Sequence, residues 1–271
     1  MPTPPRIFDR KAYALRRMRR HAESFLARDA AEGLAERIAA VNRRFTRAAD
    51  LSARPESHAL LAPLADHWTV TTPGDVDEEA LPFAPESFDL IVSVLSLHAV
   101  NDLPGALIQI RRALKPDGLF LAALFGGDTL HELRDAFAVG ESETTGGISP
   151  RVFPFADVRD LGGLLQRAGL ALPVADVERT TVRYAGFDRL VADLRDLGET
   201  NVLVERSRRP LRKATLAAML GHYQTQYGAA DGTLGATFEV IYLSGWAPHE
   251  SQQKPLAPGS AKARLADALK F

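Results

Sequence analysis

Residues 81–127 constrain the fold of this chain more than any other stretch. Residues 88–95 are almost continuously apolar, which is typical of a strand buried on both faces. Apolar residues then recur at helical spacing over residues 103–114, and a second apolar run spans residues 119–125. Strand, helix and strand in this order predict a βαβ unit with parallel strands and a right-handed crossover.

Composition narrows the classes of protein that can contain this unit. The 271 residues are 46% hydrophobic, which is enough for a full core, and 33 basic residues nearly balance 34 acidic ones. We therefore expect no nucleic-acid partner, and no apolar run is long enough to predict an integral membrane segment. The absence of cysteine excludes disulfides and thiolate chemistry, and no spacing of His, Asp and Glu predicts a metal site.

Residues 1–44 are predicted to form an N-terminal helical extension. Residues 6–20 include seven basic side chains, which indicates a helix with a solvated basic face or, alternatively, an arm that binds anions or a partner. The buried side of this helix is expected to hold four apolar residues, Ile7, Phe8, Leu15 and Met18. A second helix is predicted over residues 30–42. The Arg-rich start resembles a mitochondrial transit peptide, but Asp9 and the scarcity of Ser favour a cytoplasmic protein.

The region that follows departs from the usual pattern of nucleotide-binding sheets. Residues 45–51 resemble the first strand of a doubly wound sheet, and a glycine-rich turn should follow so that the backbone can approach a ligand. Here residues 52–57 contain no glycine, so their side chains would occupy space that a cofactor needs, and Pro55 removes one N–H donor. A helix over residues 56–66 and a short strand over residues 67–71 are predicted next.

Several motifs carry a resemblance that covers most of the chain. They lie at residues 8–10, 77–79, 81–83, 96–98, 100–104, 114–118, 125–130, 132–134, 245–246, 249, 251–252 and 258–260. With these motifs the chain resembles the class I S-adenosylmethionine-dependent methyltransferases. It is most similar to the branch containing the mitochondrial complex I assembly factor that modifies an arginine of a quinone-site subunit. Gly126-Gly127-Asp128-Thr129-Leu130 is the motif most specific to that branch, and the malonyl-carrier-protein methyltransferases are more distant relatives. Ala99 stands where the branch usually has a tryptophan.

The resemblance implies an α/β fold, a doubly wound and mostly parallel Rossmann-like methyltransferase sheet over residues 45–247. The last strand, residues 238–243, would lie antiparallel at the sheet edge, and residues 248–271 would form a flexible tail. The family places two strand–helix units where residues 56–76 stand here, and 21 residues fit only one helix and one strand. One strand–helix unit, with its ribose-binding acid, is therefore expected to be missing.

The resemblance also implies a set of cofactor contacts. For S-adenosylmethionine these are Asp50, Ser52, Val76, Asp77, Ser93 and Leu95. Asp75 could replace the missing ribose acid, although a turn residue is the preferred interpretation. Asp77 could equally cap a short turn before Leu81.

On the substrate side, the resemblance implies catalytic roles for His98, Thr129 and Glu132. His98 lies just past the carboxyl end of a predicted strand, and open α/β sheets bind their ligands at the carboxyl ends of the strands. The alternative is a histidine that is only packed in the core. Thr129 as a helix cap and Glu132 on a polar helix face are alternatives for the other two. Residues 140–155 are rich in Gly, Ser and Thr and are predicted to form a loop that covers the pocket.

Two functions remain open from the sequence. The first is an S-adenosylmethionine-dependent enzyme that methylates or hydroxylates a protein. The second is a pseudoenzyme that has lost the cofactor and chaperones a protein partner, such as a complex I subunit. The glycine-free turn and the short segment after it favour the second function, because both remove cofactor contacts.

Overall fold

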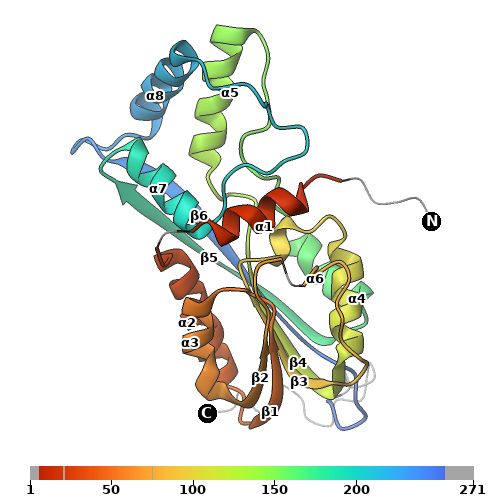
Figure 1. The fold of residues 1–271 in the computed structure, drawn as a ribbon. Coiled ribbons are helices and arrows are strands. Elements are labelled where there is room, and N and C mark those ends of the chain that lie inside the picture. The colour runs from red at the N-terminus through yellow and green to blue at the C-terminus, as the bar shows by residue number, and fades with distance from the viewer. Residues whose placement is uncertain (1–5, 21, 75, 254–271) are drawn as a thin grey trace, which may run out of the picture.

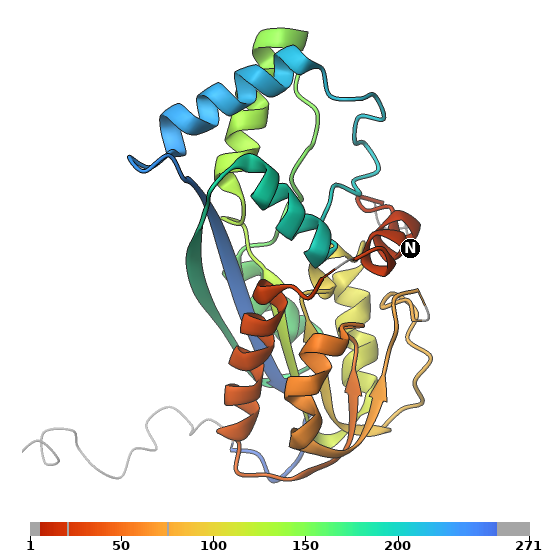
Figure 2. The same cartoon turned by 60° about the vertical axis from the view of Figure 1, so that its left-hand side comes forward.

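The computed structural model describes residues 6–20, 22–74 and 76–253. Six strands in these residues form one sheet, in the order β2-β1-β3-β4-β6-β5 (Figures 1 and 2). The strands are β1 (Phe45–Asp50), β2 (Ala65–Val70), β3 (Phe88–Val94), β4 (Leu114–Phe125), β5 (Ala171–Tyr184) and β6 (Leu234–Trp246). The first four pair in parallel, and β6 runs antiparallel to β4 and β5. The predicted mostly parallel doubly wound sheet is confirmed.

The position predicted for the last strand is wrong. β6 is antiparallel as expected, but it lies between β4 and β5, and β5 forms the sheet edge. Residues 236–243 of β6 are all buried, whereas most of β5 is exposed. An apolar run interrupted only by Glu239, such as Phe238–Leu243, therefore marks a strand covered on both faces rather than an edge.

The segment between β1 and β3 is as short as its length predicts. Its described residues form α3 (Pro55–Leu61), the 3-10 turn η1 (Ala62–Leu64) and β2, which pairs in parallel with β1. The helix ends earlier than predicted because Pro63 follows, and a proline in a helix interior removes one hydrogen bond. The sheet therefore ends at β2 on this side, with one helix and one strand between β1 and β3 where the resemblance implied two of each.

Helices cover both faces of the sheet. α2 (Phe25–Ala39) and α3 lie on one face, and α4 (Leu103–Ala113) and α6 (Val158–Arg167) lie on the other (Figures 1 and 2). Alternate residues of β3 point to opposite faces, so that Leu90 packs with the α2 side and Ile91 with the α4 side. The βαβ unit of β3, α4 and β4 is the predicted one.

A second group of helices lies beyond the carboxyl ends of the parallel strands. It consists of α5 (His131–Thr145), α7 (Phe187–Leu197) and α8 (Lys213–Tyr227) (Figure 1). The loop predicted over residues 140–155 is wrong at its start, because residues 140–145 belong to α5. Gly140 lets α5 approach α8, since a Cβ there would meet the Met219 backbone nitrogen at 2.8 Å. The Gly- and Ser-rich composition therefore reflects close helix packing for part of this stretch.

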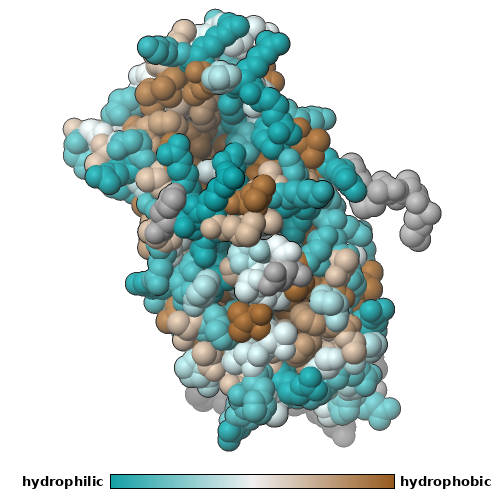
Figure 3. Space-filling model, viewed as in Figure 1, coloured by the Kyte–Doolittle hydropathy of each residue, from teal (hydrophilic) through white to brown (hydrophobic). Residues whose placement is uncertain are grey.

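Hydrophobic residues gather at the top of the molecule, over the α5, α7 and α8 group (Figure 3). A surface groove between α7 and α8 is lined there by Val191, Leu216 and Leu220, among others. No helix in the described part of the chain is both long enough and apolar enough to span a bilayer.

α1 (Arg10–Met18) lies across the carboxyl ends of β1 and β3, with Arg17 donating a hydrogen bond to the Ser52 carbonyl oxygen. The predicted buried side of this helix is wrong. Ile7, Leu15 and Met18 are exposed, and only Phe8 is buried as expected. α1 instead buries Tyr13, which packs in a small apolar cluster with Phe153 and Val202, and Arg17, which meets the Ser52 carbonyl oxygen.

The predicted tail falls largely outside the described residues. Within the described part, the Gln252 side chain donates hydrogen bonds to Asp117 at 3.0 Å and to the Ala247 carbonyl oxygen at 2.8 Å. Residues 254–271 and the motif at residues 258–260 lie beyond it, and so does Asp75, so these predictions stay as stated.

Candidate functional site

Asp50 ends β1 and is wholly buried. Its Oδ1 accepts a hydrogen bond from the Ser52 backbone N–H at 2.8 Å, and its Oδ2 lies 3.2 Å from His58 Nδ1. Its backbone oxygen accepts a hydrogen bond from Thr71 Oγ1 at 3.1 Å. The carboxylate thus orders the turn after β1, and the backbone carbonyl of the same residue holds the start of the turn after β2.

The turn after β1 places Arg54 inside the protein, with no exposed surface. The preceding Ala53 has a left-handed backbone conformation with φ +50°, which glycine adopts with less strain. Arg54 donates hydrogen bonds to the carbonyl oxygens of Leu197 at 2.8 Å and Leu95 at 3.2 Å. Burial, together with the nearby charge of Arg17, lowers the pKa of Arg54 to about 10. A buried guanidinium therefore fills the space beside the end of β1.

Glu199 provides the counter-charge for this guanidinium. Its Oε1 lies 3.3 Å from Arg54 Nη2 and accepts a hydrogen bond from the Tyr13 hydroxyl at 2.8 Å. Its Oε2 lies 3.0 Å from His98 Nε2. Burial alone would raise the pKa of Glu199, but its interactions with His98 and Arg54 outweigh burial and hold that pKa below its ordinary value. Glu199 was not predicted, because no local pattern distinguishes an acid directly after a helix-ending glycine.

Four of the predicted cofactor residues are buried and make their contacts inside the protein. The Ser52 hydroxyl accepts a hydrogen bond from the Val94 N–H at 2.8 Å, and its carbonyl accepts one from Arg17. The Ser93 hydroxyl lies 2.7 Å from the Ser96 hydroxyl. The carbonyl of Leu95 is bonded to Arg54, and the contacts of Asp50 are those given above. The polar groups of these four residues thus stabilise the strand ends.

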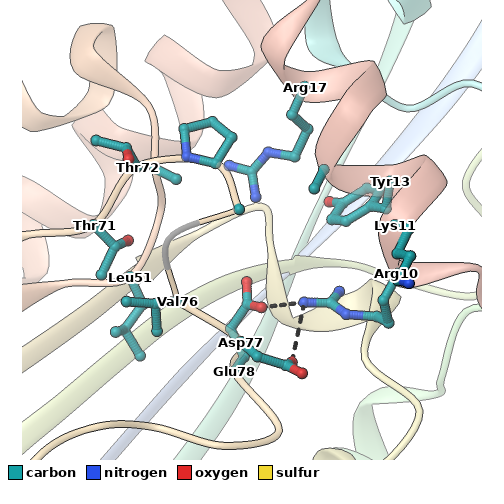
Figure 4. Close-up of a pocket in the computed structure, with 14 residues that line it drawn as sticks. Arg10, Lys11, Tyr13, Arg17, Leu51, Thr71, Thr72, Val76, Asp77 and Glu78 are labelled. Carbon is teal, nitrogen blue, oxygen red and sulfur yellow. Dashed lines mark hydrogen bonds and ion pairs between the residues drawn. The ribbon is translucent and has the colours of Figure 1, made fainter.

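The other two predicted cofactor residues, Val76 and Asp77, line a half-open cavity of about 200 Å³ beside α1, the α1 cavity (Figure 4). Arg10 of α1 forms an ion pair with Glu78, and its Nη2 lies 3.9 Å from Asp77. Asp77 also accepts a hydrogen bond from the Glu79 N–H at 3.1 Å, which is the turn-capping contact that the sequence offered as an alternative.

The second cavity near these residues is the phenylalanine cavity, of about 160 Å³, on the side of α5 and α7. Its wall contains six phenylalanines, Phe125, Phe137, Phe153, Phe155, Phe187 and Phe238. Its polar lining residues are Thr129, Arg151, Glu199, Thr200 and Asn201, and Thr200 Oγ1 is buried without a hydrogen-bond partner in the described residues. Phe153 and Phe155 come from the loop after α5, so the end of the predicted loop does contribute to a pocket.

The three predicted catalytic residues do not form one cluster. His98 is buried and packs against Phe125 and Phe155, with ring centroids 5.1 and 5.6 Å apart. Its Nδ1 is buried and has no hydrogen-bond partner within the described chain. His98 therefore lies between the Arg54–Glu199 pair and the wall of the phenylalanine cavity.

Thr129 and Glu132 instead fasten the start of α5 to β6. Thr129 Oγ1 donates to the Glu239 carbonyl at 3.0 Å and accepts from the Glu239 N–H at 3.1 Å. Glu132 accepts hydrogen bonds from the Thr237 N–H at 3.1 Å and the Thr237 hydroxyl at 2.5 Å. These contacts are structural ones, and the catalytic roles of all three residues stay predictions.

Comparison with known proteins shows which family has this fold and these motifs. A family profile described as a methyltransferase domain matches residues 27–122. The chain is 44% identical over 195 residues to the mitochondrial arginine hydroxylase NDUFAF5 of Danio rerio, which covers 72% of this chain and 60% of that protein. It is 48% identical over 185 residues to the human protein of the same name, covering 68% and 53%. The chain belongs to the class I methyltransferase family.

Within that family, the similarity to the arginine hydroxylases confirms the branch that the motifs indicated. The chain is also 37% identical over 174 residues to a malonyl-[acyl-carrier protein] O-methyltransferase of Gallionella capsiferriformans, covering 64% and 57%. In each of these pairs the match spans between half and two thirds of the relative's own length.

Solved structures support the fold alone. A Bacillus halodurans protein described as a methyltransferase superposes with a TM-score of 0.52 at 15% identity, covering 80% of this chain and 98% of that one. The YcgJ protein of Bacillus subtilis superposes with a TM-score of 0.51 at 14% identity, covering 80% and 99%.

S-adenosylmethionine, the cofactor that this family implies, does not fit the turn after β1 in this structure. Close approach of a ligand needs a turn without side chains, and here Arg54 fills the adjoining space. The carbonyl of Ser52, which also belongs to this turn, is bonded to Arg17. In addition, the cofactor carries a sulfonium cation, and Arg17 at the same strand end opposes it electrostatically, whereas the charge of Arg54 is balanced by Glu199.

Proposed function

We propose that this protein is a partner-binding member of the methyltransferase family that works without S-adenosylmethionine. The observation that carries the proposal is the wholly buried Arg54, held by two carbonyl oxygens and Glu199 beside the end of β1. Moving this guanidinium out would leave two buried carbonyls and one buried carboxylate without their partner. Because a buried ion pair that loses one member costs about 3–5 kcal/mol, displacement by a ligand is opposed by a similar amount.

The partner in this proposal is a protein, and a respiratory complex I subunit is the specific candidate. Two apolar surfaces support a protein partner, the phenylalanine cavity and the groove between α7 and α8. The complex I candidate comes from the resemblance to the assembly-factor branch. Under this proposal, the phenylalanine cavity receives a side chain of the partner.

Calorimetric titration with S-adenosylmethionine and with its demethylated product tests the loss of the cofactor. The wild-type chain is expected to give no binding heat at about 1 mM ligand. The triple variant Ser52→Gly, Arg54→Gly, Glu56→Gly removes the side chains that stand where the family has a bare turn, and it serves as the comparison. Micromolar binding by the wild type would refute the proposal.

An active enzyme that methylates or hydroxylates a protein is the second candidate. The half-open α1 cavity favours it, since Val76 and Asp77 line that cavity and were predicted to contact the adenine. This candidate predicts micromolar cofactor binding that Val76→Trp abolishes, because the larger side chain would fill the cavity. The same titration therefore separates the two functions.

A further inference from the structure

The α1 cavity has a cationic wall that the proposed function does not use. Arg10, Lys11 and Arg17 of α1 line one side of it, and Leu51 and Thr71, which follow β1 and β2, line another side (Figure 4). Arg10 pairs with Glu78 and lies 3.9 Å from Asp77, so that three cations of the wall face two acids. The wall therefore keeps a net positive charge, and Lys11 and Arg17 are its cations without an ion pair in the described residues.

Arg17 is a buried cation without an ion pair of its own. Its residue is 4% exposed, and in the described residues no carboxylate lies within 4.0 Å of its guanidinium. The buried acid near enough to act on its charge is Glu199, which is already paired with Arg54 and His98. Its Nη2 donates to the neutral carbonyl oxygen of Ser52, and its Nε is buried with no hydrogen-bond partner in the same residues. Buried charges in proteins are normally paired, so this arrangement indicates a missing anion.

Lys11 adds a second cation at the mouth of the same cavity. It is exposed, and no ion pair involves it within the described chain. Tyr13 lies between Arg10 and Arg17, with each guanidinium carbon 5.4 Å from its ring centroid, and this stacking holds Arg17 toward the cavity. The apolar part of the wall, Leu51, Ala53 and Val76, suits the carbon body of a small molecule.

From these contacts we infer that the α1 cavity binds a small molecule through a phosphate or carboxylate group held by Arg17 and Lys11. A guanidinium with a free Nε–H is suited to an oxyanion, because both offer planar, charge-assisted hydrogen bonds. The inference rests on the proposed function, since it requires that this space is no longer a cofactor site.

The probes for the test are orthophosphate and succinate, with glycerol as the uncharged comparison. Binding is followed by the ¹H–¹⁵N resonance of Arg17 Nε in the full chain at low, constant ionic strength. Either anion should shift this resonance with a Kd below about 1 mM, and glycerol should not. The stronger of the two probes identifies phosphate or carboxylate as the natural group.

Three variants assign the binding to the cavity. Arg17→Gln should weaken anion binding, measured by calorimetry, by about tenfold or more, because it removes a charge-assisted hydrogen bond. Lys11→Gln should weaken it several-fold, and since Lys11 is exposed this variant tests the site even where Arg17→Gln does not fold. Arg16→Gln is the matched control, because Arg16 is exposed on the same helix and lines a different pocket.

Two results would overturn the inference. One is the absence of binding by both anions, and the other is an equal loss of binding in Lys11→Gln and Arg16→Gln, which would indicate only the general charge of α1. Micromolar binding of S-adenosylmethionine would instead refute the proposed function, so that the two failures can be told apart.

Discussion

Replacing Glu199 with Gln should lower the stability of the protein more than any exposed charge change does. Glu199 is the only carboxylate within 4.0 Å of the Arg54 guanidinium in the described part of the chain, and both side chains are at most 4% exposed. The amide would leave a buried cation without a counter-charge. Breaking a buried pair in this way costs about 3–5 kcal/mol, out of a typical total stability of about 5–15 kcal/mol.

Urea unfolding at pH 7 measures this loss, because urea, unlike guanidinium, does not screen charges. With a slope of about 3 kcal/mol per molar urea, the midpoint should fall by about 1 M or more. Glu178→Gln is the matched control, since Glu178 pairs with Arg37 at the surface and is 56% exposed. That control should change the stability by less than about 0.5 kcal/mol.

A double variant separates the pair from other effects of the substitution. Arg54→Met removes the cation, and the double variant Arg54→Met, Glu199→Gln should lose less stability than the sum of the two single variants. Equal midpoints for Glu199→Gln and Glu178→Gln would refute the view that this pair holds the end of β1 in its present form. Additive losses in the double variant would refute the coupling between the two side chains.

Three further predictions concern pH, packing and the loop after α5. Because the pKa of Glu199 is held below its ordinary value, its contribution is complete above about pH 4.5 and is lost as the pH falls through the folded-state pKa; urea midpoints from pH 7 to pH 3.5 should therefore fall more in the wild type than in Glu199→Gln. Gly140→Ala should cost about 1–3 kcal/mol because its Cβ would meet the Met219 backbone, whereas Gly221→Ala, with open space around it, should add about 0.5–1 kcal/mol, and thermal unfolding compares the two. Glu141→Gln should speed hydrogen exchange in the loop after α5 by about tenfold or more, since Glu141 accepts bonds from Ser149 and Arg151 and its pKa is lowered by them against the opposing effect of burial; unchanged exchange would contradict the role of Glu141.

The parts of the fold that the sequence determined are those whose signals are local. The βαβ unit of β3, α4 and β4 follows from apolar runs and helical spacing within fewer than 40 residues. The short segment between β1 and β3 follows from length alone, because 21 residues cannot form two strand–helix units. The absence of glycine from the turn after β1 likewise predicted that side chains occupy the space beside the end of this strand.

Only the tertiary structure decided which distant residues meet at that place. Arg54 and Glu199 are 145 residues apart in the chain, and each looks like an ordinary surface charge in the sequence. The burial of Arg17 and Tyr13 was missed for the same reason, since the groups that cover them, the Ser52 carbonyl and an apolar cluster with Phe153 and Val202, lie far away in the sequence. Local periodicity reports the polarity of one segment, whereas the position of β6 and the pairing of buried charges depend on the chemistry of the surface that the segment meets.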